Sequence, residues 1–262
     1  MEFTVEDRAV YAATGGRPFD DKLPAVVFVH GAGLDHTVWA LQTRYFAHHG
    51  RGVLALDLPG HGRSEGPLLD SIQAMAEWLA RFIEVTGVDD VALVGHSMGA
   101  LVALECAGWL GPRLRALALL GVAHKMPVHE DLLSAAMADN PQAFDLITSW
   151  GYGVAGHLGG NRAPGLWLMG GSERLLERCG PGVLYNDLNA SDLYRHALEV
   201  ATGVDSPCHL VLGANDRMTP AQRGRKLAEA IPGATVTVIP DTGHMMMLEK
   251  PDETLDALRA VL

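Results

Sequence analysis

Short apolar runs and longer periodic stretches alternate along the first half of the chain. Residues 26–29 and 91–94 are unbroken apolar runs followed closely by glycine, which is typical of strands buried on both faces of a parallel sheet. Residues 72–85 instead repeat apolar side chains every three or four positions, which predicts an amphipathic helix. Residues 1–16 predict two short strands. Because strand and helix keep alternating as far as Val122, we predict a doubly wound, mostly parallel sheet with helices on both faces.

The pattern changes after Val122. From Ala123 to about Thr202 we find helical patches but no convincing buried strand, and the glycine-rich residues 151–171 predict a loop. Apolar runs with helices after them resume near Pro207. We therefore predict an α/β fold in which residues 1–122 and 203–262 form a core with about eight strands. Residues 123–202 are predicted to form a helical cap over the carboxyl ends of the strands, where ligands bind in such sheets.

Composition narrows the possible partners. The 262 residues are 48% hydrophobic and 19% charged, as in a globular protein with ample material for a core. The formal net charge of −11 argues against nucleic acid and against an anionic membrane as partners. The three cysteines are far apart and odd in number, so neither a disulfide framework nor a zinc site is expected. The acidic first residues do not form a signal peptide, and no apolar run approaches the roughly 20 residues of a membrane span. We expect a cytoplasmic protein.

The segment Gly95–Gly99, with the sequence GHSMG, places Ser97 between a predicted strand and a predicted helix. An ordinary turn with a serine near the helix start would explain it, and so would a catalytic nucleophile. On a sharp strand-to-helix turn the serine oxygen projects from the sheet edge, and glycines two residues to either side remove side chains that would clash. The strand before Ser97 and the helix after it favour the nucleophile.

A nucleophilic serine needs a base, and the base needs an orienting acid. His244 follows the last predicted strand and is the candidate base. Asp216, at the carboxyl end of the preceding strand, is the candidate acid that fixes the histidine tautomer. Asp241 is the alternative, but it lies on the same turn as the histidine and would have to fold back. The strand after the nucleophile helix ends without a carboxylate, which favours Asp216.

Two backbone N–H groups are candidates for an oxyanion hole. The helix that follows Ser97 directs the N–H of Met98 toward the reacting centre. An earlier strand ends in HGAG, where Gly31 and Gly33 allow the chain to approach a substrate, and the N–H of Ala32 is the second candidate. His30 in the same turn is expected to brace the loop and not to react.

With these segments in view, the chain resembles the α/β-hydrolase fold superfamily along nearly its whole length. The matching segments, in chain order, are HGAG, DLPGHGRS, GHSMG, GANDRMTP and GHMMMLEKP. The resemblance implies that Ser97 is the nucleophile, that His244 is the base and that Asp216 orients it. It also implies that the N–H groups of Ala32 and Met98 form the oxyanion hole and that residues 123–202 shape the pocket. The residues of DLPGHGRS expected to be structural are Asp57, His61 and Ser64.

The substrate is less constrained. The serine at the elbow excludes the branches that carry an aspartate there, such as haloalkane dehalogenases and epoxide hydrolases. The residues predicted to line an apolar pocket are Leu34, Met126, Trp150, Trp167, Met218 and Met245. The arginines that could bind a substrate carboxylate are Arg162, Arg174 and Arg217. None of them is clearly placed to do so by the sequence, which favours neutral acyl esters or lactones.

We therefore predict a serine hydrolase, without cofactor or metal, that cleaves carboxylic esters of small, largely apolar molecules with water. Lactones, thioesters, carbon–carbon bonds of ring-fission products and perhydrolysis are alternatives on the same three residues. A ligand receptor on a hydrolase scaffold is an alternative from another class, without positive support in the sequence. The expected partner is a small-molecule ester, with no nucleic acid and no membrane, and the expected state is a monomer or homodimer.

Overall fold

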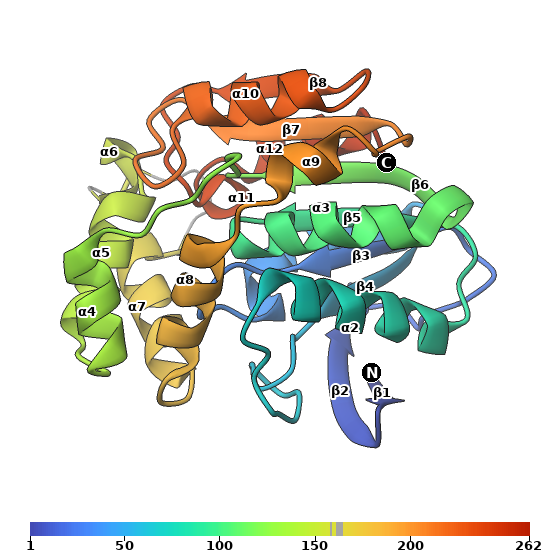
Figure 1. Cartoon of the computed structure of the whole chain (residues 1–262), viewed down its shortest axis with the longest axis horizontal. Helices are drawn as coiled ribbons and strands as arrows, with labels where there is room; N and C mark the ends of the chain where they lie inside the picture. The colour runs from blue at the N-terminus through green and yellow to red at the C-terminus, as the bar shows by residue number, and fades with distance from the viewer. Residues whose placement is uncertain (158, 161–164) are drawn as a thin grey trace.

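Eight strands form one mostly parallel sheet in a computed structural model of the chain, which describes residues 1–157, 159–160 and 165–262 (Figure 1). The order across the sheet is β1-β2-β4-β3-β5-β6-β7-β8. β2 pairs antiparallel with β1 and with β4, whereas the remaining neighbours are parallel. The strands are β1 (Glu2–Val5), β2 (Arg8–Ala13), β3 (Ala25–Val29), β4 (Gly52–Leu56), β5 (Val91–His96), β6 (Leu114–Leu120), β7 (Cys208–Gly213) and β8 (Thr235–Ile239). The predicted fold class is confirmed.

Helices cover both faces of this sheet (Figure 1). One face carries α2 (Ile72–Thr86), α3 (Met98–Leu110), α9 (Ala197–Ala201) and α10 (Ala221–Ala230). The other face carries α1 (Ala40–His48), α11 (Met246–Glu249) and α12 (Pro251–Arg259), and two short 3-10 helices are η1 (His36–Trp39) and η2 (Gly111–Arg113). None of the helices in the described part of the chain is long and apolar enough to cross a membrane.

Five helices between β6 and β7 gather at one end of the sheet (Figure 1). They are α4 (Glu130–Met137), α5 (Gln142–Gly151), α6 (Val154–His157), α7 (Leu168–Arg178) and α8 (Val183–Leu193), and we call them the helical insertion. The loop predicted for residues 151–171 is wrong in part, because α6 and the start of α7 lie within it. The buried positions Leu168, Ser172 and Leu176 recur every four residues on α7, a helical spacing that the surrounding glycines obscure in the sequence.

Residues 183–200, the last of the helical patches found in the sequence between Ala123 and Thr202, form two helices, because Tyr194 adopts an extended backbone between α8 and α9. Its ring is buried, and its hydroxyl donates a hydrogen bond to the Glu105 carboxylate on α3. This contact ties the end of the helical insertion to the core, and α9 then packs on α3 and α10 with the core helices.

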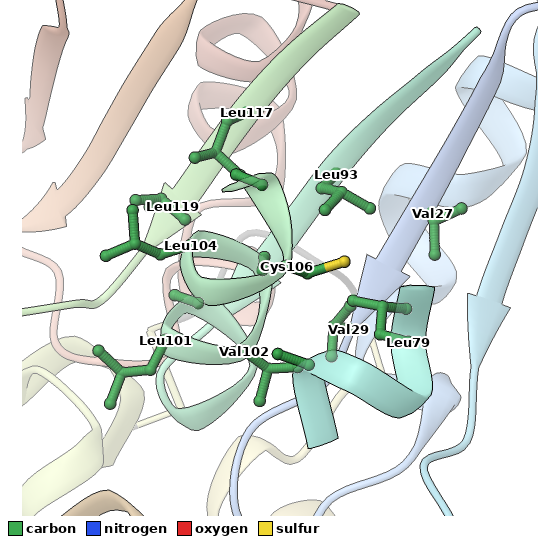
Figure 2. Close-up of a cluster of buried hydrophobic side chains, with 14 of the residues drawn as sticks. Val27, Val29, Leu79, Leu93, Leu101, Val102, Leu104, Cys106, Leu117 and Leu119 are labelled. Atoms are coloured by element: carbon green, nitrogen blue, oxygen red, sulfur yellow. The ribbon is translucent and has the colours of Figure 1, made fainter. Parts of the chain in front are cut away.

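One apolar layer lies on each face of the sheet. Along β3, Val27 and Val29 belong to one layer and Val26 and Phe28 to the other, as expected for alternate strand residues. Figure 2 shows the first layer, where Leu104 of α3 lies beside Leu119 of β6 and belongs to the same cluster as Leu93 and Leu117. Full burial of a large apolar side chain contributes roughly 1.5–3 kcal/mol. This packing fixes the carboxyl ends of β3, β5, β6 and β7, where the candidate site lies.

Candidate active site

Ser97 stands at a strained turn between β5 and α3. Its backbone has φ 54° and ψ −119°, its side chain makes no capping bond to the helix, and its N–H donates to Leu120 O at 2.9 Å. Ser71, at the start of α2, is a useful contrast, because it has φ −145° and its Oγ accepts from the Ala74 N–H. A positive φ costs a non-glycine residue roughly 1–2 kcal/mol. The ordinary helix-start interpretation therefore describes Ser71 and does not describe Ser97.

Glycines on both sides of Ser97 make this turn possible. A Cβ on Gly95 would lie 2.2 Å from Gly99 O, and a Cβ on Gly99 would lie 2.3 Å from His30 O. Both contacts are with backbone atoms, so no side-chain rotation could relieve them. The close approach of Gly99 also brings the end of β3, with its HGAG turn, against the start of α3.

His244 and Asp216 are joined at the ends of the last two strands. The His244 Nδ1–H donates to Asp216 Oδ2 at 2.8 Å, and both side chains are buried. With Nδ1 protonated, Nε2 is the basic nitrogen, and it has no hydrogen-bond partner among the described residues. The structure thus joins the two residues that the sequence places 28 positions apart. Asp241, the alternative acid, is exposed in the turn after β8 and makes no ion pair with His244 in the described ranges.

The Asp216 carboxylate is held on several sides. Oδ1 accepts from the N–H groups of Met218 at 2.9 Å and Thr219 at 2.8 Å, and Oδ2 accepts from the Thr219 hydroxyl at 2.7 Å. Burial by itself raises the pKa of Asp216, but the neighbouring His244 and these hydrogen bonds outweigh burial and hold the pKa below its ordinary value. The carboxylate therefore stays charged and fixes the imidazole ring.

The backbone of His244 is anchored to the helical insertion and to the elbow. Its N–H donates to Gly151 O, at the end of α5, at 2.7 Å, and its carbonyl accepts from His96 Nε2 at 2.9 Å. The ring lies against Gly121 at the end of β6, where a Cβ would be 3.0 Å from ring atoms. Burial lowers the pKa of His96 to about 3, so this histidine is a neutral donor.

Glu249 supports the same loop and was not singled out by the sequence analysis. Its Oε1 accepts from the Gly243 N–H at 2.9 Å, and its Oε2 accepts from the Gly153 N–H at 2.8 Å. One buried carboxylate therefore holds the turn before His244 and the segment between α5 and α6. Burial raises the pKa of Glu249. The signal in the sequence is a single acidic residue after an apolar run, in MMMLEKP.

The structure places the two predicted oxyanion donors, Ala32 and Met98, in the turn after β3 and at the start of α3. Ala32 lines the cavity described below, and Met98 is the first residue of α3. His30 braces the turn before Ala32, because its Nδ1–H donates to Gly31 O at 2.9 Å and its Nε2 accepts from the Leu58 N–H at 3.1 Å. Burial, together with the neighbouring His61, lowers the pKa of His30 to about 4. This neutral, doubly bonded ring fits the expected bracing role.

His61 and Asp187 form a buried ion pair between the core and the helical insertion. His61 Nε2 lies 2.8 Å from Asp187 Oδ2, and the same oxygen accepts from the Gly33 N–H at 2.9 Å. Burial lowers the pKa of His61, but the Asp187 carboxylate outweighs burial and raises it above its ordinary value. Helix α8 is thereby bonded to the residue next to Ala32.

A cavity of about 650 Å³ lies between the sheet edge and the helical insertion, and both Ser97 and His244 line it. Of the predicted pocket residues, those in its wall are Leu34, Met126, Trp150, Met218 and Met245. Trp167 is not, because its side chain is 70% exposed and lies against Gly170 on the outside of α7. Apolar wall residues that the sequence analysis missed come from the insertion: Leu132, Ile147, Leu176 and Leu188.

The candidate arginines have different positions. Arg174 is exposed and pairs with Glu177 away from the cavity, and Arg162 lies outside the described residues. Arg217 does line the cavity, and so does Arg223 of α10.

Comparison with known proteins assigns the chain to a family. The model of the alpha/beta hydrolase family matches residues 26–257. The chain belongs to this family. This α/β hydrolase is 25% identical to an (E)-2-((N-methylformamido)methylene)succinate hydrolase of Acinetobacter baylyi, over 90% of the chain and 89% of the relative. It is 28% identical to a pimeloyl-[acyl-carrier protein] methyl ester esterase of Aromatoleum aromaticum, over 88% of the chain and 94% of the relative.

Other similar proteins differ in length or share the fold alone. The α/β hydrolase spans 64% of the length of a dihydrolipoyllysine-residue acetyltransferase component of the acetoin cleaving system of Cupriavidus necator, at 27% identity over 94% of the chain. The crystal structure of the enol-lactonase of Burkholderia xenovorans superposes with a TM-score of 0.87, covering 100% of this chain and 99% of that one at 21% identity. That likeness shows the fold.

Proposed function

We propose that this α/β hydrolase is a serine hydrolase that cleaves carboxylic esters of small, largely apolar substrates. The observation that carries the proposal is the His244 ring, whose Nδ1 is bonded to the Asp216 carboxylate and whose buried Nε2 is left without a partner in the described part of the chain. Ser97, strained and free of a capping role, lines the same cavity. A nucleophile, a base and an orienting acid are the parts that acyl transfer requires.

The reaction follows from these roles. Ser97 Oγ attacks the acyl carbon while His244 Nε2 takes its proton, and the Asp216 carboxylate stabilises the imidazolium. The carbonyl oxygen becomes an oxyanion that accepts from the N–H groups of Ala32 and Met98. His244 returns the proton to the leaving alcohol, which leaves an acyl-enzyme on Ser97. Water, activated by His244, then attacks the acyl group and releases the acid.

The apolar cavity wall supports a substrate with an apolar body, and residues 123–202 act in this proposal as the cap that shapes the pocket. Leucines and an isoleucine of the helical insertion line the cavity together with Met218 and Met245 of the core turns. The relative named as a methyl ester esterase supports ester cleavage. Lactones and thioesters share the acyl chemistry and are natural comparison substrates.

The first test is hydrolysis of p-nitrophenyl esters, with a lactone and a thioester panel beside them. We expect Ser97→Ala to retain no more than roughly 10⁻⁴ of the wild-type rate, because the nucleophile is lost while the fold remains. Wild-type protein should be labelled stoichiometrically by a serine-reactive phosphonate, and Ser97→Ala should not be. Undiminished turnover by Ser97→Ala contradicts the proposal, and a burst of one product per chain followed by silence indicates the receptor alternative.

The acid is tested by a matched pair in the same assay. Asp216→Asn should lower kcat by roughly 10⁴-fold, since an amide at this position favours the wrong imidazole tautomer. Asp241→Asn, in the turn after β8, should leave kcat within about twofold of wild type. The reverse result would assign the orienting role to Asp241.

A further inference from the structure

Two arginines line the cavity on the side of the acid turn. Arg217 directly follows Asp216, and Arg223 lies in the first turn of α10. Both are exposed, whereas Ser97 and His244 are 8% and 3% exposed. The arginines therefore stand toward solvent and the reacting groups stand deep. The sequence leaves Arg217 as a candidate without a clear placement, and the structure puts it in the cavity wall together with Arg223.

The cavity wall contains two arginines and no carboxylate. Its described lining residues include Arg217 and Arg223 but no Asp or Glu, although the chain has 31 acidic and 20 basic residues other than histidine. Neither arginine forms an ion pair in the described ranges. Exposed arginines elsewhere do pair with carboxylates, as Arg174 does with Glu177 and Arg259 does with Asp256.

Three acidic residues near this wall already have partners. Asp216 is buried, and its oxygens accept from His244, Met218 and Thr219. Asp192 accepts from the N–H of Val128, a lining residue, and Asp131 lies 3.6 Å from His129. The two guanidinium groups are thus left for a ligand.

The backbone under both arginines is fixed. The bonds from Met218 and Thr219 to Asp216 Oδ1 set the turn that carries Arg217. The Arg223 N–H donates to Pro220 O at 2.8 Å, and Pro220, at the start of α10, also lines the cavity. A planar guanidinium suits anionic oxygen groups because it can donate two parallel hydrogen bonds.

We propose that Arg217 and Arg223 form an anion subsite at the outer end of the cavity. The preferred substrate is then an ester that carries a second, free anionic oxygen group, a carboxylate or a phosphate, at the far end of an apolar body. The apolar wall holds the body, Ser97 attacks the ester, and the arginines hold the anionic end. This inference rests on the proposed esterase function and names the substrate class of the same site.

The test compares two substrates of equal chain length. p-Nitrophenyl hydrogen adipate carries a terminal carboxylate, and p-nitrophenyl hexanoate does not. The measured quantity is the ratio of their kcat/KM values for wild type, Arg217→Gln, Arg223→Gln and the double variant. Arg225→Gln is the matched control, because Arg225 is exposed on the same helix but does not line the cavity.

We expect the anionic-to-neutral ratio to fall at least tenfold in the double variant, to fall partially in each single variant and to stay within twofold in Arg225→Gln. Raising NaCl from 50 to 500 mM should lower the ratio for wild type by screening the charges. An analogue with a terminal phosphate distinguishes the two anion sources by which substrate gives the larger ratio. Equal ratios for wild type, double variant and control overturn the inference.

Failure of the inference is distinguishable from failure of the proposed function. Wild type that cleaves both esters without charge selectivity retains the esterase function and refutes the subsite. Wild type that cleaves neither ester, or Ser97→Ala that cleaves both, refutes the function and the subsite together. Phosphonate labelling of Ser97 in each arginine variant shows that its nucleophile is intact.

Discussion

At the scale of single residues, the site depends on backbone contacts that tolerate no side chain. Gly99 lies so close to the end of β3 that a Cβ would meet His30 O at 2.3 Å and Val29 O at 2.4 Å. Gly108, on the same helix α3, faces nothing within 4 Å and is exposed. The two glycines have the same secondary structure and opposite surroundings.

The pair predicts opposite effects of one substitution. Gly99→Ala should lower the free energy of unfolding by about 3 kcal/mol, because backbone must move to accept the methyl group. Gly108→Ala should raise it by about 0.4–1 kcal/mol, because alanine reduces the entropy of the unfolded chain and fits a helix. Urea unfolding of both variants measures the difference. Equal stabilities would contradict the close packing of α3 against β3.

At the scale of elements, the helical insertion is bonded to the core at the HGAG turn and at the turn after β4. Helix α8 supplies Asp187, whose Oδ2 accepts from His61 in the turn after β4 and from Gly33 in the HGAG turn. A Cβ on Gly33 would meet Leu184 of α8 at 2.9 Å, so the same helix also packs on that turn. The geometry of the predicted oxyanion loop is therefore set partly by the insertion.

Removing the Asp187 carboxylate should be costly. Asp187→Ala leaves the buried His61 without its counter-charge and the Gly33 N–H without an acceptor, so we expect a loss of roughly 3 kcal/mol of unfolding free energy near pH 6. Because the folded state raises the pKa of His61, this contribution is complete below pH 6.5 and is lost as the pH rises through the raised pKa. Urea unfolding from pH 6 to pH 10 should show wild type and variant converging. Asp205→Asn, an exposed change before β7, should show no such convergence.

The sequence predicts local elements better than the contacts between them. Apolar runs such as Val91–Val94 define their strands because both faces are buried, and the turn residues Ser97, Asp216 and His244 follow from glycine spacing at strand ends. The bond from Asp187 to Gly33 spans 154 positions, and no periodicity encodes it. The start of α7 and the break at Tyr194 depend likewise on tertiary packing. The wall of the cavity was therefore predicted less completely than the residues at its base.

At the scale of the whole molecule, several ionisable groups make stability depend on pH. Burial holds the pKa of His30 at about 4 and that of His96 at about 3, against 6.5 for an ordinary histidine. Below pH 6.5 these two histidines therefore bind protons in the unfolded chain but stay neutral in the folded chain, so acid favours unfolding. The lowered pKa values of Asp57 and Asp216 act in the same direction at lower pH, whereas the pair of His61 and Asp187 weakens in alkali. Stability should be greatest near neutral pH.

The loss of unfolding free energy in acid can be measured directly. At pH 5 each of the two neutral histidines, His30 and His96, should cost roughly 2 kcal/mol relative to neutral pH, or roughly 4 kcal/mol together. Urea unfolding of wild type and His30→Asn at pH 7.5 and pH 5 isolates the His30 share, because the raised pKa values of His61 and Glu249 act in both proteins, and the loss in acid should be roughly 2 kcal/mol smaller in the variant. His48→Gln, an exposed change on α1, should leave it unchanged. NMR titration of the ring protons gives an independent reading on the wild-type protein. If His30 and His96 titrate near pH 6.5, these rings become charged in the folded state under mild acid, and their assignment as neutral braces of the GHSMG and HGAG turns is contradicted.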